Sequence, residues 1–256
     1  MERVLFLAAL LAPLVSGGLL CLLRDREGPR VPLAALAATV LTSALVWYLI
    51  ARAGEGTHVL LAFTESLVLC LGFDGLGRFF AGILASLWPL TVLYAMSYLR
   101  GKTRPGSFYG FFTLSYAASL GVAMAGNLFT LYVFYELLTL ATAPLVLYPM
   151  TRQALRAART YLIFSLGGAA FGFAAMVWLF THGAGGTFTL GGLLSAAADG
   201  ETARLFFLLG FLASASRPPS SPCTSGFPAQ PWSPRPLRPC CTLWPWSRRA
   251  PSPSSA

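Results

Sequence analysis

Six long apolar runs restrict what this chain can fold into more than any other feature of its sequence. Each run holds about 20 mostly apolar residues, which is the length that a transmembrane helix needs. Only 11% of the residues are charged, against about 25% in soluble domains. The runs are Val4–Leu23, Val31–Ile50, Phe73–Leu99, Phe108–Ala125, Leu128–Met150 and Tyr161–Thr181, and a seventh run begins at Ala203 and stops near Leu212. The sequence therefore predicts an all-α, polytopic transmembrane helical bundle with six complete spans and the start of a seventh.

Two segments leave alternatives open. The first run follows Arg3 and resembles a signal peptide in this respect, but it is long and leads directly into further spans. Residues 56–72 are rich in Leu, Thr and Val. They are expected to form either a short hairpin or a surface helix outside the bilayer.

The basic residues of the connecting loops predict an orientation. If the spans alternate, loops 24–30, 100–107 and 151–160 fall on one side of the membrane, and they hold nine basic residues against three on the other side. Positive charge accumulates in cytoplasmic loops. We therefore expect these three loops in the cytoplasm and the N-terminus on the extracytoplasmic side of a multi-pass protein of the inner (plasma) membrane.

Charged residues inside apolar runs are the candidate functional residues. Glu136 lies near the middle of the fifth run, where a carboxylate is costly unless it is protonated, paired or hydrated. Such residues usually mark proton or ion pathways, although a protonated Glu bonded to a neighbouring helix is the structural alternative. Asp74 and Arg78 are four residues apart, so they can form an ion pair on one helix face, as an anchor or as part of a pathway.

Other chemistry receives no support from the sequence. The five cysteines show no metal-ligand spacing, and no pattern indicates haem, flavin or iron–sulfur ligands. We therefore expect no metal and no cofactor in this chain. The net charge of +9 is spread over short loops and a C-terminal segment, which argues against nucleic acid and for a lipid bilayer as the surrounding partner.

Three motifs carry a resemblance to a known family. Residues 125–139 read Ala-Gly-Asn-Leu-Phe-Thr-Leu-Tyr-Val-Phe-Tyr-Glu-Leu-Leu-Thr, residues 71–77 read Leu-Gly-Phe-Asp-Gly-Leu-Gly, and residues 157–168 read Ala-Ala-Arg-Thr-Tyr-Leu-Ile-Phe-Ser-Leu-Gly-Gly. They resemble the antiporter-like membrane subunits of respiratory complex I, Mrp-type cation/proton antiporters and membrane-bound hydrogenases. The resemblance is closest to the D-type subunits of the Mrp antiporters, covers 70–212 well and covers 1–69 loosely.

The resemblance implies a function and partners. In that family a fifth-helix glutamate, here Glu136 as a proton relay, pairs with a seventh-helix lysine. The chain would be a proton- or Na⁺/H⁺-translocating subunit surrounded by other membrane subunits. It would be at most a non-redox subunit of an NADH:quinone oxidoreductase-like or hydrogenase-like translocase. A small-solute secondary transporter and a structural scaffold subunit are the alternatives, and the working ion and host complex stay open.

The C-terminal segment divides the chain into 1–212, the N-terminal part of an antiporter-like domain, and 213–256, a non-native or disordered tail. This tail holds eleven Pro, ten Ser and five Arg and no acidic residue. Permitted codons for residues 213–224, read with one nucleotide restored, give Gly-Phe-Gly-Val-Lys-Ala-Ala-Val-Phe-Pro-Leu-His, which resembles the family's seventh helix. The lysine falls across the codons of Ser216 and Arg217. The sequence therefore predicts a frameshift near Leu212, with a genuine disordered tail as the alternative.

Overall fold

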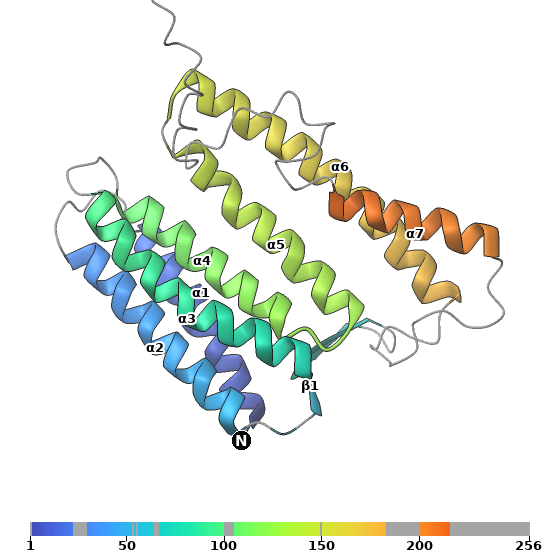
Figure 1. The fold of residues 1–256 in the computed structure, drawn as a ribbon, viewed down its shortest axis with the longest axis horizontal. Helices are drawn as coiled ribbons and strands as arrows, with labels where there is room; N and C mark the ends of the chain where they lie inside the picture. Colours follow the sequence, from blue (N-terminus) through green and yellow to red (C-terminus); the bar gives the residue numbers. More distant parts are fainter. Residues whose placement is uncertain are drawn as a thin grey trace, which may run out of the picture.

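The computed structural model describes residues 2–22, 30–52, 54, 56–63, 67–99, 105–148, 150–182 and 200–215. Within them the chain forms a helical bundle and one small hairpin (Figure 1). The elements are α1 (Glu2–Leu22), α2 (Arg30–Arg52), β1 (Gly56–Ala62), β2 (Val68–Phe73), α3 (Gly75–Tyr98), α4 (Pro105–Ala123), α5 (Leu128–Leu147), α6 (Arg152–His182) and α7 (Gly200–Ala215). The helical membrane bundle predicted from the apolar runs is confirmed.

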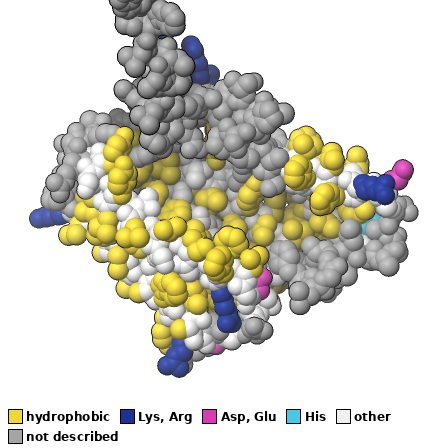
Figure 2. Space-filling model, viewed as in Figure 1, with side chains coloured by type: hydrophobic (Ala, Val, Ile, Leu, Met, Phe, Trp, Pro, Cys, Tyr) yellow, Lys and Arg dark blue, Asp and Glu magenta, His cyan; other side chains and the backbone are white. Residues whose placement is uncertain are grey.

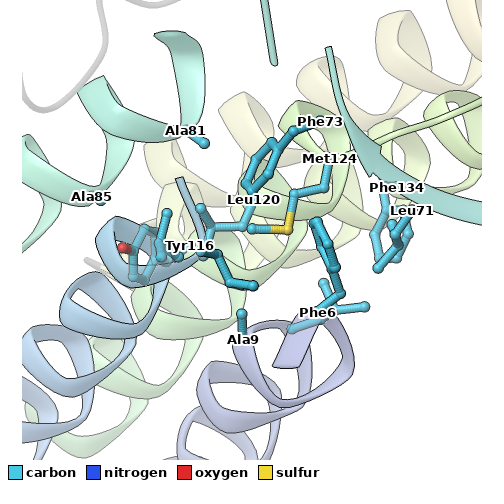
Figure 3. Close-up of a cluster of buried hydrophobic side chains, with 13 residues drawn as sticks. Phe6, Ala9, Leu71, Phe73, Ala81, Ala85, Tyr116, Leu120, Met124 and Phe134 are labelled. Atoms are coloured by element: carbon cyan, nitrogen blue, oxygen red, sulfur yellow. The ribbon is translucent and has the colours of Figure 1, made fainter. Parts of the chain in front are cut away.

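Helices α1 to α5 pack side by side, and α6 lies against α5 while α7 crosses α6 (Figure 1). The largest buried cluster joins α1, α2, α3, α4, α5 and β2 through aromatic rings and a row of aliphatic side chains (Figure 3). Its central members are Phe6, Leu49, Leu71, Tyr116, Leu120, Met124 and Phe134. Through Phe134, the cluster packs the first half of α5 against the first four helices.

Five helices of the described part are long and apolar enough to cross a membrane, namely α1, α2, α3, α5 and α6. Helix α4 carries Ser, Thr, Tyr and Gly in its middle. Those polar side chains are turned inward, since Thr113, Ser115 and Tyr116 are all buried. A helix that is surrounded by other helices does not need a lipid-facing apolar surface.

Large apolar side chains cover much of the outer surface, as Figure 2 shows for one face. On α3 they include Phe79, Leu87, Leu90 and Tyr94, and on α7 they include Phe207 and Phe211. A monomeric soluble protein rarely exposes apolar patches of this extent. A bilayer around the bundle accounts for them.

The hairpin between α2 and α3 decides the open alternative for residues 56–72. Strands β1 and β2 pair antiparallel, from Gly56 opposite Phe73 to Ala62 opposite Val68. The hairpin lies at the end of the bundle where α1 begins (Figure 1). There Glu2 approaches His58 at 3.3 Å, and the Arg3 guanidinium donates a hydrogen bond to the Leu60 carbonyl at 3.1 Å.

The described helices begin within three residues of the predicted runs, except for α6. Helix α3 begins at Gly75, two residues after the predicted Phe73, because Asp74 caps it by accepting a hydrogen bond from the Gly77 amide at 2.6 Å. The prediction of a loop over 151–160 was wrong, since α6 already begins at Arg152.

Helix α6 begins before its apolar run because its basic first turns are amphipathic. Its 31 residues span about 46 Å, which exceeds the ~30 Å hydrocarbon core. In the first turns, Ala154, Ala157 and Ala158 are buried while Arg156 and Arg159 are exposed. The basic segment is therefore an amphipathic extension of the helix, which apolar content alone does not reveal.

Helix α7 continues to Ala215, three residues past the predicted boundary at Leu212. The rest of the predicted tail, from 216 to 256, lies outside the described residues.

Candidate functional site

Glu136 lies in the middle of α5, eight residues after the first residue of this 20-residue helix. At 1.5 Å per residue it is about 12 Å from the start of the helix. Its side chain is half-buried. Helix α5 packs against α4 on one side and α6 on another, so the carboxyl is carried by a helix that lies between two others.

The start of α5 is held by a buried polar pair. Asn127 is the N-cap, and its side-chain oxygen accepts hydrogen bonds from the Thr130 amide, at 2.8 Å, and from the Thr130 hydroxyl. The same two side chains also reach β2. The Asn127 amide donates to the Val68 carbonyl, and the Thr130 hydroxyl accepts from the Cys70 amide at 2.9 Å. The cap therefore connects α5 to the hairpin.

Backbone hydrogen bonds strengthen the same connection. The Gly72 amide donates to the Met124 carbonyl and the Gly126 amide donates to the Cys70 carbonyl, both at 2.9 Å, so the segment that precedes α5 pairs briefly with β2. A Cβ on Gly126 would lie 2.9 Å from the Thr57 Cγ2. Glycine is needed here because the two segments approach too closely for a side chain.

Sequence reasoning found Glu136 but assigned no role to Asn127 or Thr130. A local pattern was present for Asn127 alone, because an Asn immediately before an apolar run is typical of a helix N-cap. No local sequence pattern predicts the hydrogen bonds to β2, since Val68 and Cys70 lie about sixty positions earlier in the chain.

Two hydrogen bonds join α5 to α6. The Tyr132 hydroxyl donates to the Ala169 carbonyl at 3.3 Å, and the hydroxyls of Thr142 and Tyr161 are 2.8 Å apart.

Near the first of these bonds, Gly172 gives α7 access to the interface between α5 and α6. A Cβ on Gly172 would lie 3.4 Å from the Ala213 Cβ and 3.8 Å from the Tyr132 ring. The last turns of α7 thus come close to α5 one helical turn before Glu136.

Asp74 and Arg78 occupy the first turn of α3. Asp74 is exposed and serves as the N-cap, and the Arg78 amide donates to the Asp74 backbone carbonyl at 3.0 Å. Arg78 is half-buried. Their predicted ion pair stays a prediction.

Asp74 lines a cavity of about 500 Å³ between α3, α4 and α5, together with Gly77, Leu131 and Leu138. Glu136 is not among the residues that line this cavity. At 100° per residue, it is turned about 140° away from Leu131 on α5. The structure therefore does not bring Asp74 and Glu136 to one site. Among the described residues, no three His, Cys, Asp or Glu side chains gather where they could hold a metal ion.

Comparisons with known proteins found relatives for part of the chain. No family model matches it. The A-type subunit of a Na⁺/H⁺ antiporter from Alkalihalophilus pseudofirmus is 34% identical over 125 residues, which is 47% of this chain and 15% of that protein. The A1-type subunit of a Na⁺/H⁺ antiporter from Staphylococcus aureus is 36% identical over 84 residues, or 33% of this chain and 10% of that protein.

Solved structures share the fold over most of the chain. One polypeptide of respiratory complex I from Thermus thermophilus aligns with a TM-score of 0.66 and 27% identity, over 84% of this chain and 43% of that chain. One polypeptide of the Mrp complex from Dietzia aligns with a TM-score of 0.71 and 21% identity, over 82% of this chain and 23% of that chain. One polypeptide of an archaeal membrane-bound sulfane sulfur reductase aligns with a TM-score of 0.66 and 16% identity, over 83% of this chain and 44% of that chain.

These likenesses confirm the resemblance to antiporter-like membrane subunits that the three motifs predicted. They also set its extent. The chain spans about a seventh or less of the length of the curated relatives that it matches, and less than half of the structural neighbours.

Proposed function

We propose that this chain is the N-terminal part of a proton- or Na⁺/H⁺-translocating membrane subunit, in which Glu136 relays protons. The observation that carries the proposal is the placement of this acidic side chain, half-buried, at the middle of a helix that packs between two others in an apolar bundle. Carboxylates in such positions are rare and mark proton or ion pathways. The relatives with antiporter names and the shared fold support the same activity.

A carboxyl relays protons when its charged and neutral forms are close in free energy. Withdrawal from water favours the neutral form, whereas a nearby cation favours the charged form. A cation that moves relative to Glu136 therefore switches the carboxyl between binding and releasing a proton. The proposed function needs such a cation on a neighbouring helix.

The end of α7 is the part of a neighbouring helix from which a cation could reach Glu136. Ala213 lies near Tyr132, through Gly172, and α5 and α7 run in the same general direction (Figure 1). Permitted codons, read with one nucleotide restored, give a lysine at position 217, four residues or one turn beyond Ala213, and Glu136 is one turn beyond Tyr132. Restoring the frame would thus supply the cation at the level of Glu136. This agreement supports our proposal that residues 213–256 are translated out of frame.

The orientation and surroundings complete the proposal. The N-terminus and the hairpin face the extracytoplasmic side of the cell's inner membrane, and the basic starts of α2 and α6 face the cytoplasm. Other membrane subunits cover the flanks of the bundle, as in the multi-subunit complexes that contain the structural neighbours.

Transport by the frame-restored protein tests the function. The corrected gene, expressed with its neighbouring subunits in inverted membrane vesicles, should give a cation-dependent pH change. Glu136→Gln should abolish this change, while Glu201→Gln, at the exposed start of α7, should leave it intact. Unchanged transport in Glu136→Gln would show that this carboxyl is not the relay.

A further inference from the structure

We propose that Asn127 and Thr130 are positioning residues that use the hairpin as a fixed reference to set the depth and rotation of Glu136. The inference rests on the proposed function of Glu136 and extends it to residues that never touch the transported ion. It assigns the cap of α5 a role beyond ending a helix.

First, buried hydrogen bonds connect the start of α5 to the hairpin. Asn127 is 5% exposed and Thr130 is fully buried, so water does not compete for their hydrogen bonds. Each side chain serves two partners at once, one at the start of α5 and one in β2. An ordinary N-cap needs only the bonds within the helix. The additional bonds to Val68 and Cys70 fix how far and at what angle α5 leaves the hairpin.

The second step is the rigidity of the hairpin. It is attached to α1 by the contact of Glu2 with His58 at 3.3 Å and by the hydrogen bond from Arg3 to Leu60. The ring of Phe6 packs against both His58 and Phe73, at centroid distances of 5.4 and 5.1 Å. Since β2 leads directly into the cap of α3, the hairpin is held by two helices besides α5.

The third step is transmission along α5. Thr130 and Glu136 are six residues apart, about 9 Å along the axis. The helix contains neither Gly nor Pro from Leu128 to Ala143, and Pro144 comes after Glu136. A shift or rotation at the cap therefore reaches Glu136 without a flexible point between them.

The test reads the surroundings of the Glu136 carboxyl in the purified 256-residue chain in lipid nanodiscs. The infrared stretching band of this carboxyl group, assigned by its loss in Glu136→Gln, has a frequency that depends on local hydrogen bonding. Thr130→Val removes the hydroxyl at nearly constant volume, and Thr130→Ser keeps it. Thr39→Val is the matched control, because Thr39 is equally buried and its hydroxyl bonds only to carbonyls of its own helix.

We expect the band to move in Thr130→Val and to stay in place in Thr130→Ser and Thr39→Val. Faster amide hydrogen exchange at Cys70 in Thr130→Val should accompany the move. Asn127→Asp gives a second, independent probe, since it keeps the cap acceptor but loses the donor to Val68, and it should also move the band. If Thr130→Val does not fold, Asn127→Asp decides.

An unmoved band in a folded Thr130→Val with fast exchange at Cys70 would overturn the proposal, as would equal movement in Thr39→Val. Failure of both cap variants to fold would also overturn it, because the bonds would then serve folding as such. The infrared result does not depend on transport. Failure of Glu136→Gln to abolish transport in the frame-restored protein would refute the proposed function separately.

Discussion

At the crossing of α1 and α4, the glycine at position 17 decides how closely the two helices approach. A Cβ at Gly17 would lie 2.9 Å from the Leu114 Cγ and 3.0 Å from the Gly110 carbonyl oxygen, whereas nothing lies within 4 Å of a Cβ at Gly18. Gly17→Ala should therefore destabilise the bundle by about 1–3 kcal/mol through overpacking. Gly18→Ala should be neutral or stabilising by up to ~1 kcal/mol, since Ala favours helix. Thermal unfolding in detergent measures both, and equal effects would contradict the close packing.

A buried hydroxyl pair provides a second prediction for single residues. The Ser43 and Tyr116 hydroxyls are 2.8 Å apart, and both residues are buried. Ser43→Ala should cost about 1–3 kcal/mol of stability, because the Tyr116 hydroxyl is left buried without that partner. Adding Tyr116→Phe to Ser43→Ala should recover part of this loss. A double-mutant cycle in detergent measures the coupling, and strictly additive losses would show that the two hydroxyls do not support each other.

The sequence predicted only those residues of the candidate site whose role can be recognised from their neighbours in the chain. Glu136 stands out because it is an acidic residue inside an apolar run. Asn127 and Thr130 do not stand out in the same way, because their bonds to β2 depend on the hairpin folding back onto the start of α5. Gly126 is similar, since the need for glycine comes from Thr57 and Cys70 across the interface.

Among the elements, hydropathy located the helices but not all of their ends. Five predicted span starts lie within three residues of the structure, because at those ends the apolar run and the helix coincide. The α6 start differs by nine residues, from Tyr161 to Arg152, since helix formation continues into the basic segment where apolar content stops. The hairpin could be predicted only as one of two alternatives, because a short apolar run fits strand and helix equally.

The interior position of α4 gives a prediction about lipid contact. Its side chains from Phe108 to Leu120 are buried or half-buried, whereas α3 exposes Phe79, Leu87 and Leu90. A membrane-dissolved photoreactive carbene should therefore label α3 several-fold more than α4. Mass spectrometry of the digested chain in nanodiscs measures the ratio. Labelling of α4 at the level of α3 would show that α4 lies on the outside of the bundle.

The proposed orientation gives a prediction about the connecting segments. Gly54 follows α2 at the hairpin end, and Gly101 lies in the basic segment between α3 and α4. In a variant without the native cysteines, Gly54→Cys in intact cells should react with an impermeant thiol reagent. Gly101→Cys should react only after the membrane is permeabilised. The reverse pattern would invert the orientation and place the basic segments outside the cell.

At the scale of the whole molecule, the packing is uneven. Helices α1 to α5 share continuous buried clusters, whereas α7 packs mainly on α6 and exposes Leu205, Phe207, Leu208 and Phe211. The structural neighbours are longer chains within membrane complexes, and this chain covers less than half of each. Further helices or subunits against α6 and α7 would cover this apolar surface, and lipid covers it in their absence.

The 256-residue chain alone is expected not to move protons across a membrane. Proton transfer across ~30 Å of hydrocarbon needs several sites, because one carboxyl cannot reach both faces. It also needs a cation near Glu136 that can change the proton affinity of the carboxyl. The only lysine in the sequence is Lys102, in the segment before α4. Arg217 precedes a Pro pair, which ends helices, and arginine does not deprotonate in proteins.

We therefore expect the 256-residue chain, purified and reconstituted into liposomes with a pH-sensitive dye inside, to leave proton and Na⁺ gradients unchanged. The frame-restored protein, reconstituted with its neighbouring subunits, should dissipate or exchange these gradients in a Glu136-dependent manner. Empty liposomes and the Glu136→Gln protein control for leakage. Glu136-dependent transport by the 256-residue chain alone would contradict the need for a cation on the helix that α7 begins.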